Sequence, residues 1–253
     1  MTTTSPTTPQ TPAPKVLLVM AMQAEADPVI DAFGLAPDPE LATDRLGHRR
    51  WCGNLGRLEI ALSTNGVDPQ HGVDRIGTNA AVLNTLMSVE RDEPGLVIST
   101  GTSGGYRRNG AEIGSVYLAA GALWFHDRRI ELPGFGDYAL GGVEPVPLGA
   151  TAERLGFEQG PFTTGDSLDE SEPDRIRIAG TGAVAKDMEA AAVGVTCQRL
   201  STPVTALRCI TDLVDDPAPT VEQFSANLAA ATERLAEALL ALVRDLEQHP
   251  GVV

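Results

Sequence analysis

The stretch VTALRCITD, residues 204–212, opens with a run from Val204 to Ile210 that shows no alternation of apolar and polar residues and closes with a carboxylate. Similar apolar runs recur at Val16–Met20, Leu96–Ile98 and Val116–Ala120. Such runs are typical of strands buried on both faces, as in a parallel or mixed sheet covered by helices. The sequence therefore predicts a core sheet that includes these four strands.

Helical patterns lie between the apolar runs. Glu25–Phe33 is short and is followed by Gly34, while Glu189–Leu200 is rich in Ala and Val. Residues 73–86 carry apolar side chains at helical spacing, continued one turn further: Ile76, Ala80, Leu83 and Met87. The alternation of strands and helices predicts an α/β fold.

The last helix has the clearest pattern. Thr220 and Gln223 match a capping box, in which the two side chains each bond a backbone N–H of the first turn. An apolar stripe follows and ends before Pro250-Gly251, and it consists of Phe224, Leu228, Ala231, Leu235 and Leu239. We expect a long amphipathic helix that lies across the sheet. By contrast, residues 128–147 are rich in Gly and Pro and predict a long functional loop.

Composition excludes several classes of protein. The 253 residues carry 19 Lys+Arg against 34 Asp+Glu, a formal charge of -15, which disfavours binding to nucleic acid or anionic membranes. No apolar run approaches the ~18 residues that span a bilayer. Cys52, Cys197 and Cys209 are widely spaced and odd in number, which suits a reducing cytoplasm. We expect a disordered Thr/Pro-rich tail at 1–14 and one domain at 15–248.

Polar segments follow the predicted strands, and ligands of open α/β sheets bind at such positions. The segments are Ala21–Glu25, Ser99–Gly105, Thr163–Asp169, Lys186–Glu189 and Arg208–Asp212. We find no nucleotide-binding glycine spacing and no metal-ligand spacing, so we expect neither cofactor nor metal.

Each segment also has a structural interpretation. Glu25 could be a first-turn acid that faces the helix dipole, Ser99–Gly105 an ordinary glycine-rich turn, and Thr163–Asp169 an Asx turn. Asp212 could open a loop, but a carboxylate that closes a buried strand must be paired, hydrogen-bonded or protonated. Asp212 is therefore the strongest functional candidate among these acids.

Taken in chain order, the polar segments resemble those of the 5'-methylthioadenosine/S-adenosylhomocysteine nucleosidases, within the nucleoside phosphorylase superfamily. The sequences of several motifs are most similar to those of the plant-type methylthioadenosine nucleosidases, and the resemblance runs from about residue 15 to about residue 228. The motifs that carry it are AMQAE (21–25), TGTSGG (100–105), FHDRR (125–129), TGDS (164–167), DMEAAA (187–192) and TDLVD (211–215).

The resemblance implies a single domain with a mixed central β-sheet flanked by helices, a homodimer, and hydrolysis of the adenine N-glycosidic bond of a 5'-thioadenosine. By matching position, Glu25 would activate water and Asp212 would protonate adenine N7. Met188 and Glu189 would hold the ribose. The remaining substrate-binding positions that it implies are Leu168 and Asp169 at the adenine, Thr102 and Thr211 near Asp212, Arg208 near Glu25, and Phe125 and Phe224 at the 5' end.

These roles agree with the chemistry of the bond. Cleavage of a ribosyl C–N bond needs a proton donor at the purine and an activated water at the sugar. Two carboxyls can share this work if their environments separate their pKa values. We expect Asp212 at the end of an apolar strand to be protonated, and Glu25 to stay ionised.

Two alternatives remain open. A phosphorolytic purine nucleoside phosphorylase would need arginines for phosphate, and none lies within residues 21–25 or 99–102. A non-catalytic nucleoside-binding or storage protein would not need Glu25, Glu189 and Asp212 together. The sequence leaves open which 5' substituent is preferred: methylthio, homocysteinyl or hydrogen. Phe125 and Phe224 could also be core aromatics.

Overall fold

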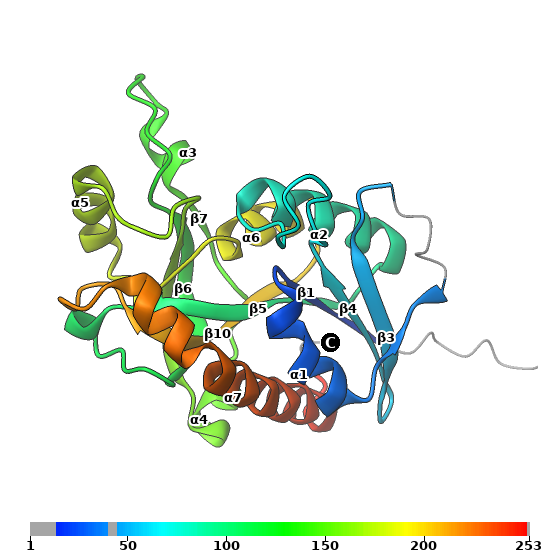
Figure 1. Ribbon diagram of the computed structural model, residues 1–253. Helices are drawn as coiled ribbons and strands as arrows, with labels where there is room; N and C mark the ends of the chain where they lie inside the picture. The colour runs from blue at the N-terminus through cyan, green and yellow to red at the C-terminus, as the bar shows by residue number, and fades with distance from the viewer. Residues whose placement is uncertain (1–13, 40–44, 252–253) are drawn as a thin grey trace, which may run out of the picture.

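A mixed sheet of ten strands forms the centre of the computed structural model, which describes residues 14–39 and 45–251 (Figure 1). The strands are β1 (Lys15–Met20), β2 (Ala36–Pro37), β3 (Arg49–Leu55), β4 (Leu58–Thr64), β5 (Leu96–Gly105), β6 (Val116–Phe125), β7 (Gly141–Val143), β8 (Glu158–Thr164), β9 (Ala185–Asp187) and β10 (Val204–Leu213). The four apolar runs become β1, β5, β6 and β10, which confirms those predictions. The predicted tail at 1–14 lies almost wholly outside the described residues, and the domain limits stay a prediction.

Parallel pairing fixes where the strands end. β4, β1, β5 and β10 are parallel neighbours, so their carboxyl ends meet at one edge of the sheet. β5 also pairs with β9, β9 with β8, β8 with β6, and β6 with β10. Because β10 pairs with both β6 and β5, these five strands close into a ring. The predicted α/β fold with a mixed sheet is confirmed.

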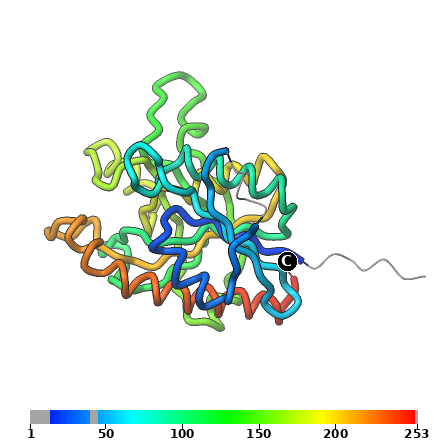
Figure 2. Tube along the Cα trace, turned by 45° about the vertical axis from the view of Figure 1, so that its right-hand side comes forward, coloured from blue at the N-terminus to red at the C-terminus, as the bar shows by residue number. Residues whose placement is uncertain are grey.

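Helices cover both sides of the sheet (Figures 1 and 2). They are α1 (Gln23–Phe33), α2 (Thr78–Asp92), α3 (Gly136–Leu140), α4 (Gly149–Leu155), α5 (Glu172–Thr181), α6 (Ala190–Arg199) and α7 (Thr220–Gln248), with a 3-10 turn at Arg107–Asn109. One apolar core joins α1, α4 and α7 to the sheet, and a second joins α2 and α6 to its other side. Among residues 14–39 and 45–251, no helix has the length and apolar character needed to cross a membrane.

The segment Ser99–Gly105 is not a turn. It continues β5 to its end, because its backbone pairs with β10 on one side and, at Gly104 and Gly105, with β9 on the other. The glycine-rich turn considered above is therefore wrong. Strand pairing of this kind joins residues far apart in the chain, which a local pattern does not reveal.

The helix predicted from residue 73 begins later, at Thr78, and its apolar face was assigned to the wrong side. Ile76 precedes α2, and Leu83 and Met87 on it are exposed. The buried face mixes apolar Ala81 and Val89 with polar residues, among which Asn84 accepts a hydrogen bond from the Ser63 hydroxyl at 2.5 Å. The larger apolar side chains of α2, Leu83 and Met87, thus face outward.

The predicted amphipathic helix at the C-terminus is confirmed as α7, with Ala231, Leu235 and Leu239 buried. The capping box is wrong, because Pro219 occupies the cap position and no side chain caps the helix. The Gln223 side chain instead bonds the end of β10 and the loop after it: its oxygen accepts the Leu213 N–H at 3.1 Å and its amide donates to the Ala218 carbonyl at 2.9 Å.

Residues 128–147 form an arm that projects from the body and contains α3 and the short strand β7 (Figures 1 and 2). No helical period predicted α3, which is only five residues long. Leu132 and Phe135 before it and Tyr138 on it are exposed, with Phe135 and Tyr138 in an edge-to-face contact at 5.9 Å between ring centroids.

Candidate active site

A cavity of about 310 Å³ opens at the edge where the parallel strands end. The ends of β5, β9 and β10, the turn after β1 and the loop after β8 supply its walls. Eight residues that the sequence singled out line it: Glu25, Thr102, Leu168, Met188, Glu189, Thr211, Asp212 and Phe224. The position agrees with the rule for ligand sites of open α/β sheets.

Glu25 is buried at the start of α1, behind the end of β5. One of its carboxylate oxygens accepts both the backbone N–H and the hydroxyl of Thr102, each at 2.6 Å. Burial raises the pKa of Glu25, while Thr102 and the charge of Arg208 oppose the rise. We expected an ionised Glu25 and placed Thr102 beside Asp212. Thr102 in fact bonds Glu25, and burial shifts the equilibrium of this carboxyl toward its neutral form.

Asp212 lies near the end of β10 and is 2% exposed. The hydroxyl of Thr211 donates to its Oδ1 at 2.7 Å, whereas Oδ2 finds no hydrogen-bond partner among the described residues. Burial raises the pKa of Asp212, as the sequence predicted, and the Thr211 hydrogen bond and the charge of Lys186 oppose the rise. Because a buried polar atom without a partner is costly, Oδ2 is suited to bond a ligand.

Two glycines of β5 have no side chain and so leave space for the carboxyl groups of Glu25 and Asp212. A Cβ on Gly101 would lie 3.2 Å from both carboxylate oxygens of Glu25. On Gly104 it would lie 2.9 Å from Oδ2 of Asp212. The glycines of TGTSGG therefore allow two acids to approach one strand, and this explains the motif without a phosphate-binding turn.

Glu189 precedes α6 and reaches the segment before α2. Its Oε1 accepts the N–H of Gly77 at 2.8 Å. Burial, together with the charge of Asp187, raises the pKa of Glu189 to about 7. Met188 beside it contributes an apolar surface to the cavity.

Arg208 is 1% exposed and lies behind the cavity rather than in its wall. Its guanidinium pairs with Asp187 at 2.9 Å and donates to the carbonyl of Ser99 at 2.8 Å. Asp187 also accepts the N–H of Ala190 at the start of α6. Arg208 therefore acts on Glu25 through its charge and joins β5, β9 and β10 beneath the site.

Leu168 and Asp169 follow β8 and are both exposed, and Leu168 alone lines the cavity. The ammonium of Lys186 donates to the carbonyls of Ser167 and Leu168 at 2.7 and 2.9 Å. Asp166 accepts the N–H and the hydroxyl of Thr78, each at 2.6 Å. The loop after β8 is thus attached to both β9 and α2.

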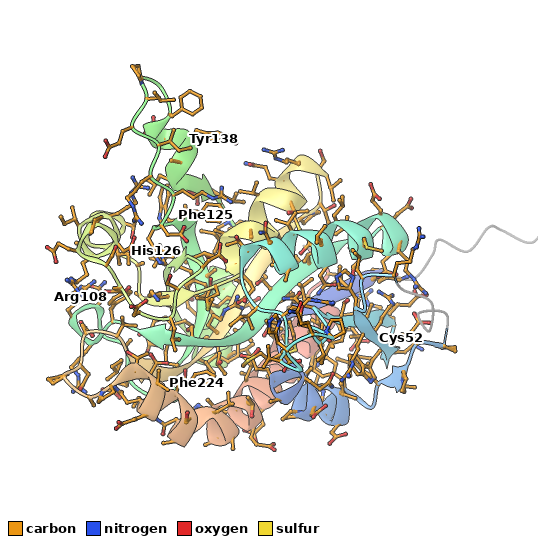
Figure 3. All side chains as sticks on the ribbon, turned by 45° about the horizontal axis from the view of Figure 1, so that its top comes forward. Cys52, Arg108, Phe125, His126, Tyr138 and Phe224 are labelled. Atoms are coloured by element: carbon orange, nitrogen blue, oxygen red, sulfur yellow. The ribbon has the colours of Figure 1, made fainter. Side chains whose placement is uncertain are left out.

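The two predicted aromatic residues have different surroundings. Phe224 lies on the first turns of α7 (Figure 3) and lines the cavity. Phe125 is fully buried, with the Arg128 guanidinium 3.3 Å from its ring centroid, and does not reach the cavity. The core interpretation therefore fits Phe125. Beside it, burial lowers the pKa of His126 to about 4, which agrees with a structural imidazole.

Sequence reasoning missed seven residues of the cavity wall: Ala21, Met22, Ile76, Ser103, Gly104, Lys186 and Asp187. Five of them belong to the motifs of the resemblance, and Lys186 belongs to the polar segment Lys186–Glu189, so their position next to predicted site residues was the available signal. Ile76 had been assigned to a helix stripe. Ser103 has a buried hydroxyl without a partner among the described residues, which makes it a further candidate for ligand contact.

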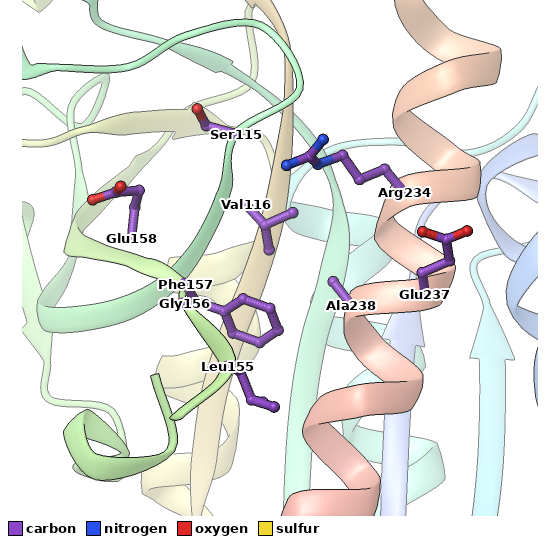
Figure 4. A pocket seen from close by; sticks show the side chains of 9 residues that line it. All are labelled: Ser115, Val116, Leu155, Gly156, Phe157, Glu158, Arg234, Glu237 and Ala238. Atoms are coloured by element: carbon purple, nitrogen blue, oxygen red, sulfur yellow. The ribbon is translucent and has the colours of Figure 1, made fainter. Parts of the chain in front are cut away.

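A larger hollow of about 490 Å³ lies beside the start of β6 (Figure 4). Arg234 and Glu237 of α7 line it together with Glu158, and none of the predicted site residues does. The described ranges 14–39 and 45–251 hold no group of three or more His, Cys, Asp or Glu residues that could bind a metal. The cavity at the strand ends therefore remains the candidate active site.

The fold and this site define a phosphorylase-type protein, and the chain belongs to the Phosphorylase superfamily, whose family model matches residues 15–244. Within that family it is 38% identical to a 5'-methylthioadenosine nucleosidase of Arabidopsis thaliana, over 88% of this chain and 84% of the relative. It is 35% identical to a 5'-methylthioadenosine/S-adenosylhomocysteine nucleosidase of the same organism, over 92% and 91%. The solved structure of Arabidopsis thaliana 5'-methylthioadenosine nucleosidase in apo form is similar, with a TM-score of 0.89, 36% identity, and coverage of 93% and 97%.

Proposed function

We propose that the protein is an N-glycosyl hydrolase that releases adenine from 5'-methylthioadenosine, with S-adenosylhomocysteine or 5'-deoxyadenosine as further candidate substrates. The observation that carries this proposal is the pair of buried carboxyls, Glu25 and Asp212, in the wall of one cavity. The names of the two Arabidopsis relatives support the same reaction.

In this reaction Asp212 protonates the departing purine. Its raised pKa keeps the proton available, and its unpartnered Oδ2 is suited to bond the base. Glu25 takes a proton from the attacking water. A raised pKa makes Glu25 a stronger base than an exposed carboxylate, because the best general base has a pKa near the working pH. Glu189 accepts hydrogen bonds from the ribose hydroxyls, and Met188 packs against the sugar.

The phosphorolytic alternative is not favoured. Lys186 is the single cationic side chain in the described wall of the cavity, and two backbone carbonyls already accept its hydrogen bonds. Phosphate would have to bind near Glu25, whose buried carboxyl offers it no positive charge. A carboxylate repels the phosphate anion, whereas it does not repel a neutral water molecule.

We therefore expect adenine release from 5'-methylthioadenosine to be independent of phosphate. Purified protein is assayed in a phosphate-free buffer, then with added phosphate, and then with a chelator. The expected products are free adenine and the free thiosugar at the same rate in all three. Formation of a sugar 1-phosphate would support phosphorolysis, and no release of base under any condition would support a binding protein.

Phe224 is proposed to contact the 5'-alkylthio group. An apolar contact favours a methylthio group by about 1–3 kcal/mol over a small polar group. We expect kcat/KM to be higher for 5'-methylthioadenosine than for adenosine, and Phe224→Ala to reduce that ratio. Val221→Ala is the control, since Val221 is exposed one turn earlier and does not line the cavity. An unchanged ratio in Phe224→Ala would place the 5' pocket elsewhere.

A homodimer is proposed as the working assembly. α2 and the arm lie on the same side of the sheet (Figure 1), and both carry exposed apolar residues: Leu83 and Met87 on α2, and Leu132 and Tyr138 on the arm. Exposed apolar patches commonly mark protein interfaces. Light scattering should give twice the 26.6 kDa chain mass. Leu83→Asp should lower the measured mass, whereas Ile113→Asp, a change at an equally exposed residue elsewhere, should not.

A cytoplasmic location stays a prediction.

A further inference from the structure

Three neighbouring strands place one residue each in a row across the base of the cavity. Gly104 of β5 pairs with Lys186 of β9 on one side and with Asp212 of β10 on the other. Residues paired directly in this way carry their side chains on the same face of the sheet. Because Gly104 has no side chain, nothing projects from β5 between the lysine and the aspartate.

The buried ammonium of Lys186 makes its hydrogen bonds to one loop, the segment after β8. It has three N–H donors, of which two bond the carbonyls of Ser167 and Leu168. Those carbonyls belong to the loop that places Leu168 in the wall of the cavity. Lys186 therefore fixes the position of that wall from within the sheet.

Four carboxyl groups act on the charge of the same ammonium. Glu170 and Asp169 after β8, Asp174 on α5 and Asp212 on β10 each favour its charged form against burial, and His126 at the end of β6 also senses its charge. Glu170 is itself occupied, because it accepts the hydroxyl of buried Tyr106.

We propose that Lys186 is a positioning residue: it holds the Leu168 segment in place and supplies the charge beside which Asp212 binds and releases its proton. The role of Lys186 in catalysis rests on the proposed function. Its effect on the pKa of Asp212 does not. The charge of Lys186 lowers the pKa of Asp212, whereas burial raises it, so removal of the charge lets burial raise this pKa further. The pKa of Asp212 should then rise by about one unit, within the range for the loss of a nearby opposite charge.

The test compares Lys186→Met, which removes the charge and both hydrogen bonds, with Lys186→Arg, which keeps the charge. Carboxyl carbons of labelled aspartates are titrated by NMR, with the Asp212 signal identified by its absence in Asp212→Asn. The Asp212 midpoint should rise by about one pH unit in Lys186→Met and stay within about 0.3 in Lys186→Arg. An equal midpoint in Lys186→Met and wild type would overturn the inference, whether or not the protein proves to be a nucleosidase.

Activity gives the second measurement. The alkaline limb of kcat/KM for adenine release should move with the Asp212 midpoint in Lys186→Met, and KM should rise because the Leu168 segment is released. Wild-type protein that releases no adenine would refute the proposed function and leave the titration as the test of Lys186. If Lys186→Met does not fold, Lys186→Gln is titrated instead. It also lacks the charge, and an unshifted midpoint there would likewise overturn the inference.

Discussion

Asp212→Asn should lose adenine release by about 10²- to 10⁴-fold, because an amide of the same shape cannot donate the proton that the departing purine needs. The Thr211 hydroxyl can still donate to the remaining oxygen, so the fold should be kept. The measurement is kcat/KM for 5'-methylthioadenosine between pH 5 and 9. In wild type, activity that needs protonated Asp212 falls as pH rises through its raised pKa, and this limb should vanish in the variant.

Asp137→Asn on the exposed arm is the matched control, since it makes the same chemical change away from the cavity. It should keep wild-type activity. Turnover near the wild-type rate in Asp212→Asn would show that another group protonates the base.

Glu25→Gln should produce a loss of similar size by removing the base that activates water. Here the pH dependence has the opposite sign. Activity that needs ionised Glu25 falls as pH drops through its raised pKa, so the acidic limb should disappear in the variant. The amide oxygen can still accept both Thr102 hydrogen bonds, which favours a folded protein.

Asp31→Asn, exposed in the last turn of the same helix, controls for the loss of a negative charge on α1. If Glu25→Gln lost the alkaline limb instead, the roles of the two acids would be exchanged. The paired experiment therefore assigns each acid and does not merely confirm that both matter.

The sequence predicted the elements whose burial is uniform. β1 and β10 are buried almost throughout, so their apolar runs were unambiguous. The outward direction of Leu83 and Met87 on α2 could not be recognised, because the pattern did not indicate which side of that helix meets the sheet. Likewise, Thr102 was assigned to the wrong carboxyl, since only the pairing of β5 with its neighbours sets the direction of its side chain.

The sequence predicted the candidate site at the ends of strands. Of the raised pKa values of Glu25 and Asp212, the sequence predicted only one. The raised pKa of Asp212 followed from its place in a buried strand. That of Glu25 did not, because a helix start suggests exposure and only the tertiary structure encloses it. Lys186 lies in one of the predicted polar segments, yet its hydrogen bonds to Ser167 and Leu168 depend on β8 and β9 lying side by side.

The ring of strands also bears on how the protein acquires activity. β10 must pair with β5, and the bond from Arg208 to Ser99 joins residues 109 positions apart. Pairings over such a separation form slowly, because a long loop of chain must close first. Asp212 meets Gly104 and Lys186 only when that closure is complete. During synthesis, then, Asp212 emerges after β5 and β9, so a partly folded chain can bury much of its core before the cavity is complete.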